Sequence, residues 1–279
     1  MIFATFRIVI VLSFKFLSLI VFFFSKKRKP IALKNIDLCF PAKSFEGKKR
    51  NYLIARDSFL MLGHSIADFF LLRFYNKKNI NHYVKFEGKY LLLYELQKGK
   101  GLIITGAHFG SCELAAHYLA LHGFKSLVLY TPIKKPYWLE KFVKSNRQRS
   151  GNILISKYSS FLKLYRHLKK GGIVLALTDQ HCSQSDGRKV PFFSHDVWTH
   201  TSFVKLSLKL GTPIVSGFVF IKNLFEYEIQ FFKALYPQDF LKLDDPEYQM
   251  ALASNRLLTK AILKKPNHWM WQHRRFKDL

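Results

Sequence analysis

The stretch 101-GLIITGAHFGSCELAAHYLA-120 decides the fold. Its first residues form a continuous apolar run that is typical of a buried strand. A turn with a glycine on each side follows, and then an apolar sequence typical of a helix. His108 lies at the turn and Glu113 lies in the first turn of the helix. Ligands bind at the carboxyl ends of the strands in a parallel α/β sheet. The sequence therefore predicts that a titratable pair lies where such a fold binds ligands.

The same alternation of strands and helices continues along the chain and predicts one α/β domain, with a mostly parallel sheet wrapped by helices. No linker rich in Pro, Gly or Ser divides the 279 residues, so we expect this single domain to cover 30–279. The further expected strands are 126–130, 172–177, 213–220 and 226–232, and the expected helices are 51–74, 112–122, 137–149, 159–170, 199–210 and 245–264.

Residues 1–29 are expected to form an N-terminal membrane-anchoring helix with a basic flank. Ile2 to Phe24 is apolar apart from Arg7 and Lys15, and 26-KKRK-29 follows at once. A helix over 8–24 is roughly 25 Å long, so it either spans a thinned bilayer or lies in the interface, and Lys15 is costly at a bilayer centre. The basic cluster predicts that the following domain is cytoplasmic.

The charge balance predicts a polyanionic partner. Lys and Arg number 45 against 18 Asp and Glu, a formal net charge of +27. Nucleic acid, an anionic membrane or lipid, and an acidic carrier protein are the three candidates. No nucleic-acid motif is present and the hydrophobic N-terminus has no role in nucleic-acid binding, so we expect no nucleic-acid partner, although a basic nucleic-acid-binding protein is the alternative from another class. Three cysteines, an odd number, favour a reducing compartment.

His108 and Glu113 have the residue types needed for general-base chemistry. A neutral imidazole accepts a proton from a hydroxyl, and a carboxylate on its other nitrogen fixes the tautomer and stabilises the imidazolium. We expect the turn to bring Glu113 back to His108. Spacing alone fits equally well a histidine with an ordinary structural role and an acid that favours the helix dipole.

The block H-F-G-S-C-E at 108–113 resembles the H-F-G-x-x-E block of bacterial lipid A biosynthesis acyltransferases, the lauroyl and myristoyl transferases. Four more stretches resemble the same family in the same order, so the resemblance covers essentially the whole chain. Family members often have an aromatic residue where this chain has Cys112. The four stretches are 35-NIDLCFP-41, 147-RQRSG-151, 178-TDQ-180 with 191-PFF-193, and 269-WMWQHRRFK-277.

The resemblance implies transfer of a fatty acyl chain from acyl carrier protein to a hydroxyl of an anionic lipid A precursor, at the cytoplasmic face of the bacterial inner membrane. His108 and Glu113 are then the catalytic residues, and no acyl-enzyme is needed if the acceptor hydroxyl attacks the thioester itself. No metal and no cofactor are expected, with the acyl carrier protein thioester as co-substrate. The alternatives are a glycolipid or phospholipid acceptor and a coenzyme A donor.

Two further pairs of residues are candidates for substrate binding near the strand ends. Arg147 and Arg149 lie at the end of the helix expected at 137–149 and can stabilise an oxyanion or bind a sugar phosphate, although solvated arginines are the simpler interpretation. Asp179 and Gln180 follow the strand 172–177, and the resemblance implies a functional acid at Asp179. A capping aspartate explains that residue nearly as well.

The aromatic and basic C-terminal block contains the last pair of candidates. Arg274 and Arg275 have planar donor forks that suit phosphate groups, whereas a basic tail on an anionic surface is the alternative. For the neighbouring Trp269 and Trp271 we expect ordinary packing rather than anchoring at a membrane interface.

Overall fold

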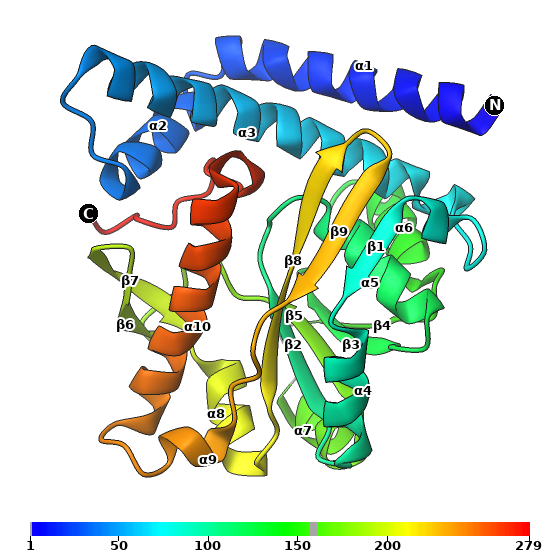
Figure 1. Ribbon diagram of the computed structural model, residues 1–279, viewed down its shortest axis with the longest axis vertical. Coiled ribbons are helices and arrows are strands. Elements are labelled where there is room, and N and C mark those ends of the chain that lie inside the picture. Colours follow the sequence, from blue (N-terminus) through cyan, green and yellow to red (C-terminus); the bar gives the residue numbers. More distant parts are fainter. Residues whose placement is uncertain (1, 157–160) are drawn as a thin grey trace.

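The computed structural model describes residues 2–156 and 161–279, and its architecture is α/β as the sequence predicts (Figure 1). The helices are α1 (Ile2–Phe24), α2 (Arg28–Cys39), α3 (Phe45–Leu71), α4 (Lys89–Gln97), α5 (Cys112–Leu121), α6 (Tyr137–Gln148), α7 (Phe161–Lys169), α8 (Ser202–Leu210), α9 (Pro237–Phe240) and α10 (Pro246–Lys264). The strands are β1 (Val84–Glu87), β2 (Leu102–Gly106), β3 (Ser126–Tyr130), β4 (Ile153–Ser156), β5 (Ile173–Leu177), β6 (Gly187–Phe192), β7 (His195–His200), β8 (Ile214–Asn223) and β9 (Glu226–Phe231).

Seven of these strands form one sheet in the order β1-β9-β8-β2-β5-β3-β4. All neighbouring pairs are parallel except β8 and β9, which form an antiparallel hairpin. β2 lies at the centre between β8 and β5, with Thr105 opposite Ser216 on one side and Ala176 on the other. The carboxyl ends of β2 and β5 therefore lie side by side.

Helices cover both faces of the sheet. Alternate residues of β2 point to opposite faces, as the pleat of a strand requires. Ile104 packs with Leu119 of α5, while Ile103 packs with Val204 of α8 and Met250 of α10. Figure 1 shows α8 and α10 on one side of the sheet and α4 and α5 on the other.

The structure corrects several of the expected element bounds. Residues 199–210 were expected to be one helix, but β7 continues to His200 and α8 begins at Ser202. The first two residues of the helix expected at 159–170 lie outside the described residues, and α7 covers Phe161–Lys169. The sequence analysis did not identify β1, β4, α4 or the β6–β7 hairpin, all of which are short.

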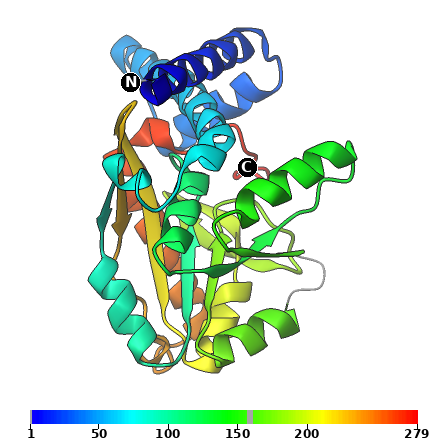
Figure 2. The same cartoon turned by 90° about the vertical axis from the view of Figure 1, so that its right-hand side faces the viewer.

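A layer of helices lies over one end of the sheet. Figures 1 and 2 show α1 and α3 side by side across this end, with α2 returning toward the body of the protein. Residues 3–24 form a helix long and apolar enough to cross a membrane. The helix expected at 51–74 is confirmed as the longer α3, which continues into a short 3-10 turn at Leu72–Phe74.

Candidate active site

His108 lies in the turn that follows β2, at the carboxyl edge of the sheet. Gly110 in this turn has φ of +56°, and a Cβ there would lie 2.1 Å from the carbonyl oxygen of Val219, so only glycine fits. The turn is short because α5 begins at Cys112. The side chain of His108 is 32% exposed, which leaves one edge of the ring open to a substrate.

The C-terminal segment fixes the His108 turn from one side. The amide of Gly110 donates to the carbonyl of His268 at 2.9 Å, and the amide of Met270 donates to the carbonyl of His108 at 3.0 Å. Phe109 and Trp269 form an antiparallel bridge between these bonds. The distinctive C-terminal block is therefore part of the framework of the site.

Asp179 is the carboxylate that contacts the His108 ring. It follows β5, the parallel neighbour of β2, and its Oδ1 lies 2.9 Å from Nδ1 of His108. Its Oδ2 accepts hydrogen bonds from the His108 amide at 3.1 Å and from Nε1 of Trp269 at 2.9 Å. Three donors thus hold a carboxylate that is only 2% exposed.

These contacts set the charge and the tautomer of the pair. Burial alone raises the pKa of Asp179, but the charge of His108 and the hydrogen bonds from its ring, Trp269 and its amide outweigh burial and bring the pKa to about 2. An ionised carboxylate only accepts, so Nδ1 of His108 carries the proton and Nε2 has the free lone pair. Burial lowers the pKa of His108, but the charge and hydrogen bond of Asp179, with the charge of Glu113, raise it overall.

Glu113 does not make the predicted contact with the His108 ring. Nε of Arg147 donates to both of its oxygens, at 3.0 and 3.1 Å, and Nη2 donates to Oε1 at 2.5 Å. This forked pairing turns the Glu113 carboxylate toward α6. The carboxylate that binds Nδ1 of the His108 imidazole is that of Asp179. Glu113 still acts on His108 through its charge, which raises the pKa of that imidazole. Its part in a reaction stays a prediction.

The other three candidates, Arg147, Arg149 and Gln180, differ in how they relate to the His108 ring. The charge of Arg147 opposes protonation of His108, so this guanidinium belongs to the same cluster of charges. Arg149 lies just past α6 and is exposed, as the solvated interpretation expects. Gln180 is half-buried, and its Nε2 lies 3.4 Å from both ring nitrogens of His108, so it is not a dedicated partner of either.

Arg275 is part of the protein interior and cannot grip a phosphate in this conformation. It is 1% exposed, and Nη1 donates to the carbonyls of Gln180 and Trp198, both at 2.8 Å. Nη2 donates to Oγ1 of Thr199 at 2.8 Å, and burial lowers the pKa of Arg275 to about 10. Arg274 is exposed. The interior position of Arg275 corrects the predicted pair of phosphate ligands, because both of its Nη atoms already donate to groups inside the protein.

Trp269 and Trp271 are packed in the core as expected, at 1% and 0% exposure. Neither the hydrogen bond from Trp269 to Asp179 nor the contact of Asp179 with His108 was predicted from the sequence. One signal pointed to the second contact: both residues directly follow strands, and the ends of parallel strands meet at one edge when the strands are neighbours.

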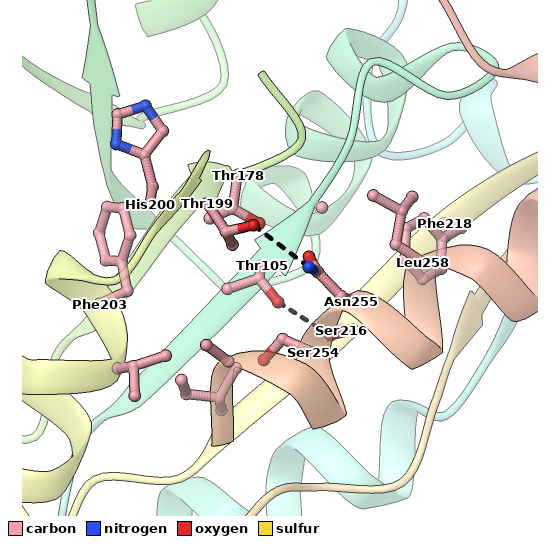
Figure 3. Close-up of a pocket in the computed structure, with 14 residues that line it drawn as sticks. Thr105, Thr178, Thr199, His200, Phe203, Ser216, Phe218, Ser254, Asn255 and Leu258 are labelled. Carbon is pink, nitrogen blue, oxygen red and sulfur yellow. Dashed lines mark hydrogen bonds between the residues drawn. The ribbon is translucent and has the colours of Figure 1, made fainter. Parts of the chain in front are cut away.

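Two cavities flank the end of β2, one on each face of the sheet. The cavity under α5 is apolar and reaches the His108 turn at Ala107 and Phe109. The lining of the other cavity mixes hydroxyl and amide groups with apolar side chains such as Phe203 and Leu258 (Figure 3). There Oγ1 of Thr105 and Oγ of Ser216 are 2.9 Å apart, and Asn255 donates to Oγ1 of Thr199 at 3.2 Å. The first cavity has the more apolar lining and is the better match for a long apolar ligand.

The sequence profile described as bacterial lipid A biosynthesis acyltransferase matches residues 5–278, nearly the whole chain. The chain belongs to this acyltransferase family. A lipid A biosynthesis palmitoleoyltransferase of Escherichia coli K12 is 28% identical over 258 residues, covering 91% of this chain and 80% of the relative. A lipid A biosynthesis acyltransferase of Haemophilus influenzae is 27% identical over 259 residues, 90% of this chain and 78% of the relative.

A third member of the acyltransferase family, a lipid A biosynthesis lauroyltransferase of Escherichia coli K12, is 25% identical over 257 residues, covering 91% of this chain and 80% of the relative. The match extends across the His108 turn, the Asp179 motif and the C-terminal block together. The protein is therefore an acyltransferase enzyme, as the sequence resemblance implies.

Replacing Trp269 with phenylalanine is expected to lower the acyl-transfer rate by up to about tenfold, because a hydrogen bond to a charged group contributes roughly 1.5–3 kcal/mol and only part of it acts on His108. The aromatic packing is kept, so the change should appear in kcat. The control is Trp271→Phe, which removes a donor to the carbonyl of Pro266 and leaves Asp179 untouched. Equal losses in both variants would show that tail packing matters and the bond to Asp179 does not.

Proposed function

We propose that this protein transfers a fatty acyl chain from acyl carrier protein to a hydroxyl of a lipid A precursor, using His108 as the general base. The observation that supports this most directly is the His108–Asp179 contact, which leaves Nε2 unprotonated on a ring that is partly exposed. A base in that state takes the proton of an acceptor hydroxyl as its oxygen attacks a thioester carbonyl. The protonated imidazole then returns this proton to the leaving thiolate.

We assign different tasks to the two carboxylates beside the base. Asp179 orients the ring and stabilises the imidazolium, since it is ionised, buried and hydrogen-bonded to Nδ1. Glu113 holds Arg147 by two of the guanidinium nitrogens and adds negative charge near His108. Arg147 is the cation of this cluster and is our candidate for stabilising the developing oxyanion, in preference to the exposed Arg149.

No covalent enzyme intermediate is part of the proposal. Cys112 precedes Glu113 directly, but burial, together with the charges of Glu113 and Asp179, raises the pKa of its thiol far above neutral pH. A protonated thiol is a poor nucleophile. The acceptor hydroxyl therefore attacks the thioester directly in this scheme.

The apolar cavity under α5 is our candidate for the acyl chain. Its walls include Cys112, Ala115 and Leu119 along one side of α5, and Phe231 from the sheet. It reaches the turn that carries His108, so a chain lying in it has its carbonyl end near the base. Burial of such a chain is favourable by about 0.8 kcal/mol per CH₂ group.

The partners in this proposal are all anionic. They are acyl carrier protein, the lipid A precursor and the inner membrane at its cytoplasmic face, and the net charge of +27 is suited to all three. The apolar residues 3–24 with the basic cluster that follows them support attachment to such a membrane. We propose no metal, no cofactor and no nucleic-acid partner.

Mass spectrometry of lipid A from cells that lack this protein tests the proposal. We expect one secondary acyl chain to be missing, and expression of the protein should restore it. The mass difference also identifies the acyl group, and fragmentation of the same lipid identifies its acceptor position. Unchanged lipid A would overturn the lipid A acceptor and favour a glycolipid or phospholipid acceptor for the same chemistry.

A further inference from the structure

The N-terminal helix α1 is attached to the rest of the protein along its whole length. Val11 and Phe22 are fully buried, and a Cβ on Gly63 of α3 would lie 2.5 Å from the carbonyl oxygen of Phe14. The rings of Phe22 and Phe59 meet at 5.3 Å. One face of α1 is thus packed on α3 as tightly as a core helix.

Arg7 fixes the N-terminal end of α1 in a buried network of charges and hydroxyls. Its guanidinium lies 3.2 Å from Asp68 of α3, and both side chains have no exposure to solvent. The guanidinium also donates to the carbonyl of Leu224, at 2.7 and 2.9 Å, and to the hydroxyls of Tyr75 and Tyr227. This arginine therefore belongs to the protein interior and not to a lipid-facing surface.

The C-terminal end of α1 is also fixed to the body of the protein. The chain turns at once into α2, where Asn35 donates to the carbonyls of Trp271 and His273 at 2.8 and 2.7 Å. Lys29 lies over the ring of Phe22 at 4.9 Å. Both ends of α1 are thus attached to one folded unit.

The opposite face of α1 is apolar and uncovered. Nine large hydrophobic side chains on it are exposed, and the only polar side chains classed as exposed along Phe3–Phe24 belong to Thr5 and Ser13, with no charged one. The nine are Phe6, Val9, Leu12, Phe16, Leu17, Ile20, Val21, Phe23 and Phe24. An apolar stripe of this length marks an interaction surface.

Basic residues lie at both ends of this face, which identifies its partner. Lys26 and Lys27 follow one end and are exposed. At the other end Phe3 and Phe6 contact Phe74, close in sequence to the exposed Lys77 and Lys78. An apolar stripe with cations at both ends complements acyl chains flanked by anionic headgroups.

We infer that α1 does not cross the bilayer but lies in its plane, with the exposed face sunk into the lipid interface and the Arg7–Asp68 pair holding it to α3. A spanning α1 would have to leave α3, and it would carry Arg7 into lipid while stranding Asp68 in the protein. If α3 moved with α1, the partly exposed Arg56 and Asp57, which lie inside α3, would enter the lipid. The flat arrangement keeps every buried partner.

This inference extends the proposed function, because it places the site relative to the lipid. Gln272, in the segment beside the His108 turn, donates to Oγ of Ser58 in α3 at 3.0 Å. The helical layer is therefore continuous with the framework of the candidate site. A flat α1 sets the carboxyl edge of the sheet just beneath the membrane surface, where an acceptor lipid can reach it without leaving its leaflet.

Nitroxide depth measurements on the full-length protein test the inference. Single labels are placed by Phe6→Cys, Leu12→Cys, Phe16→Cys and Phe23→Cys in a chain whose Cys39, Cys112 and Cys182 are replaced by alanine. The protein is bound to vesicles of phosphatidylethanolamine and phosphatidylglycerol. We expect all four labels at one shallow depth, with equal accessibility to oxygen. A depth that is greatest at Leu12 and decreases toward both ends shows a spanning helix, and four water-exposed labels show no insertion; either result overturns the inference.

A second measurement examines the ion pair. Asp68→Asn keeps the shape of the side chain but removes the charge that Arg7 faces, so the label at Phe6 should become more mobile while that at Phe23 does not change. Asp57→Asn, on the same helix but partly exposed, is the matched control. Unchanged mobility at Phe6 would overturn the claim that the Arg7–Asp68 ion pair holds α1 to α3. The depth measurements test the orientation of α1 independently of this variant. Neither readout requires turnover, so failure of the proposed acyl transfer leaves both measurements interpretable.

Discussion

His108→Ala is expected to lower acyl transfer by at least about a hundredfold, because a positioned general base contributes roughly 10²–10⁴ to the rate. Alanine leaves nothing near Asp179 to accept the proton of the acceptor hydroxyl. The side chain is part-exposed and its turn is held by backbone bonds to His268 and Met270, so folding and membrane binding should persist.

The measurement is transfer of a labelled acyl group to the lipid acceptor at saturating concentrations, with sedimentation on vesicles alongside. His82→Ala is the control, since this histidine is exposed in a short turn before β1. Retained transfer in the His108 variant would overturn the general-base assignment. Loss of vesicle binding in the same variant would indicate a wider structural role for the ring.

Asp179→Asn is expected to lower the maximal rate by about a hundredfold or more and also to move its pH dependence. The asparagine amide can donate to Nδ1, which favours the tautomer with the proton on Nε2 and so removes the base from the substrate side. Loss of the carboxylate charge also lowers the pKa of His108, because Asp179 is the strongest of the groups that raise it.

The direction of the pH shift follows from the form of His108 that works. Transfer requires the neutral imidazole, so the rate rises as the pH passes upward through the pKa of His108. A lower pKa in Asp179→Asn moves this rise to lower pH. Glu113→Gln should move it less, because the charge of Glu113 has a smaller effect on His108 than the charge and hydrogen bond of Asp179.

Glu113→Gln is the matched comparison because it makes the same chemical change on the other carboxylate. We expect its rate loss to come from releasing Arg147, so adding Arg147→Gln should cost little more than either change alone. Kinetic profiles between pH 5 and 9 measure this for four variants: Asp179→Asn, Glu113→Gln, Arg147→Gln and the double variant at Glu113 and Arg147. If Glu113→Gln shifts the profile further than Asp179→Asn, our assignment of the two carboxylates is reversed.

The α/β architecture was predictable because its central strands are short continuous runs of branched apolar residues between helices. The β6–β7 hairpin was not, since runs such as 187-GRKVPF-192 mix charged residues with a proline and resemble a loop. The same is true of β1 and β4, which have four residues each. Their assignment depends on pairing with β9 and β3, and this information is not local in the sequence.

The residues of the site were predictable from the sequence, but the contacts between those residues were not. His108 and Asp179 meet because β2 and β5 are neighbours in the sheet, and β3 and β4 separate them along the chain. Spacing favoured Glu113, which is close in sequence, but Arg147 from α6 determines where that carboxylate points. Arg275 shows the same limit: a charged residue near a chain end is expected outside, and only the folded structure shows the carbonyls that accept its hydrogen bonds.

The contacts of the C-terminal segment with the His108 turn make the acid–base pair depend on residues that are distant in the sequence. Asp179 receives a hydrogen bond from Trp269, and the turn shares two backbone bonds with His268 and Met270. Deletion from residue 268 onward is therefore expected to remove all three bonds, whereas the Arg7–Asp68 ion pair between α1 and α3 involves no residue of that segment.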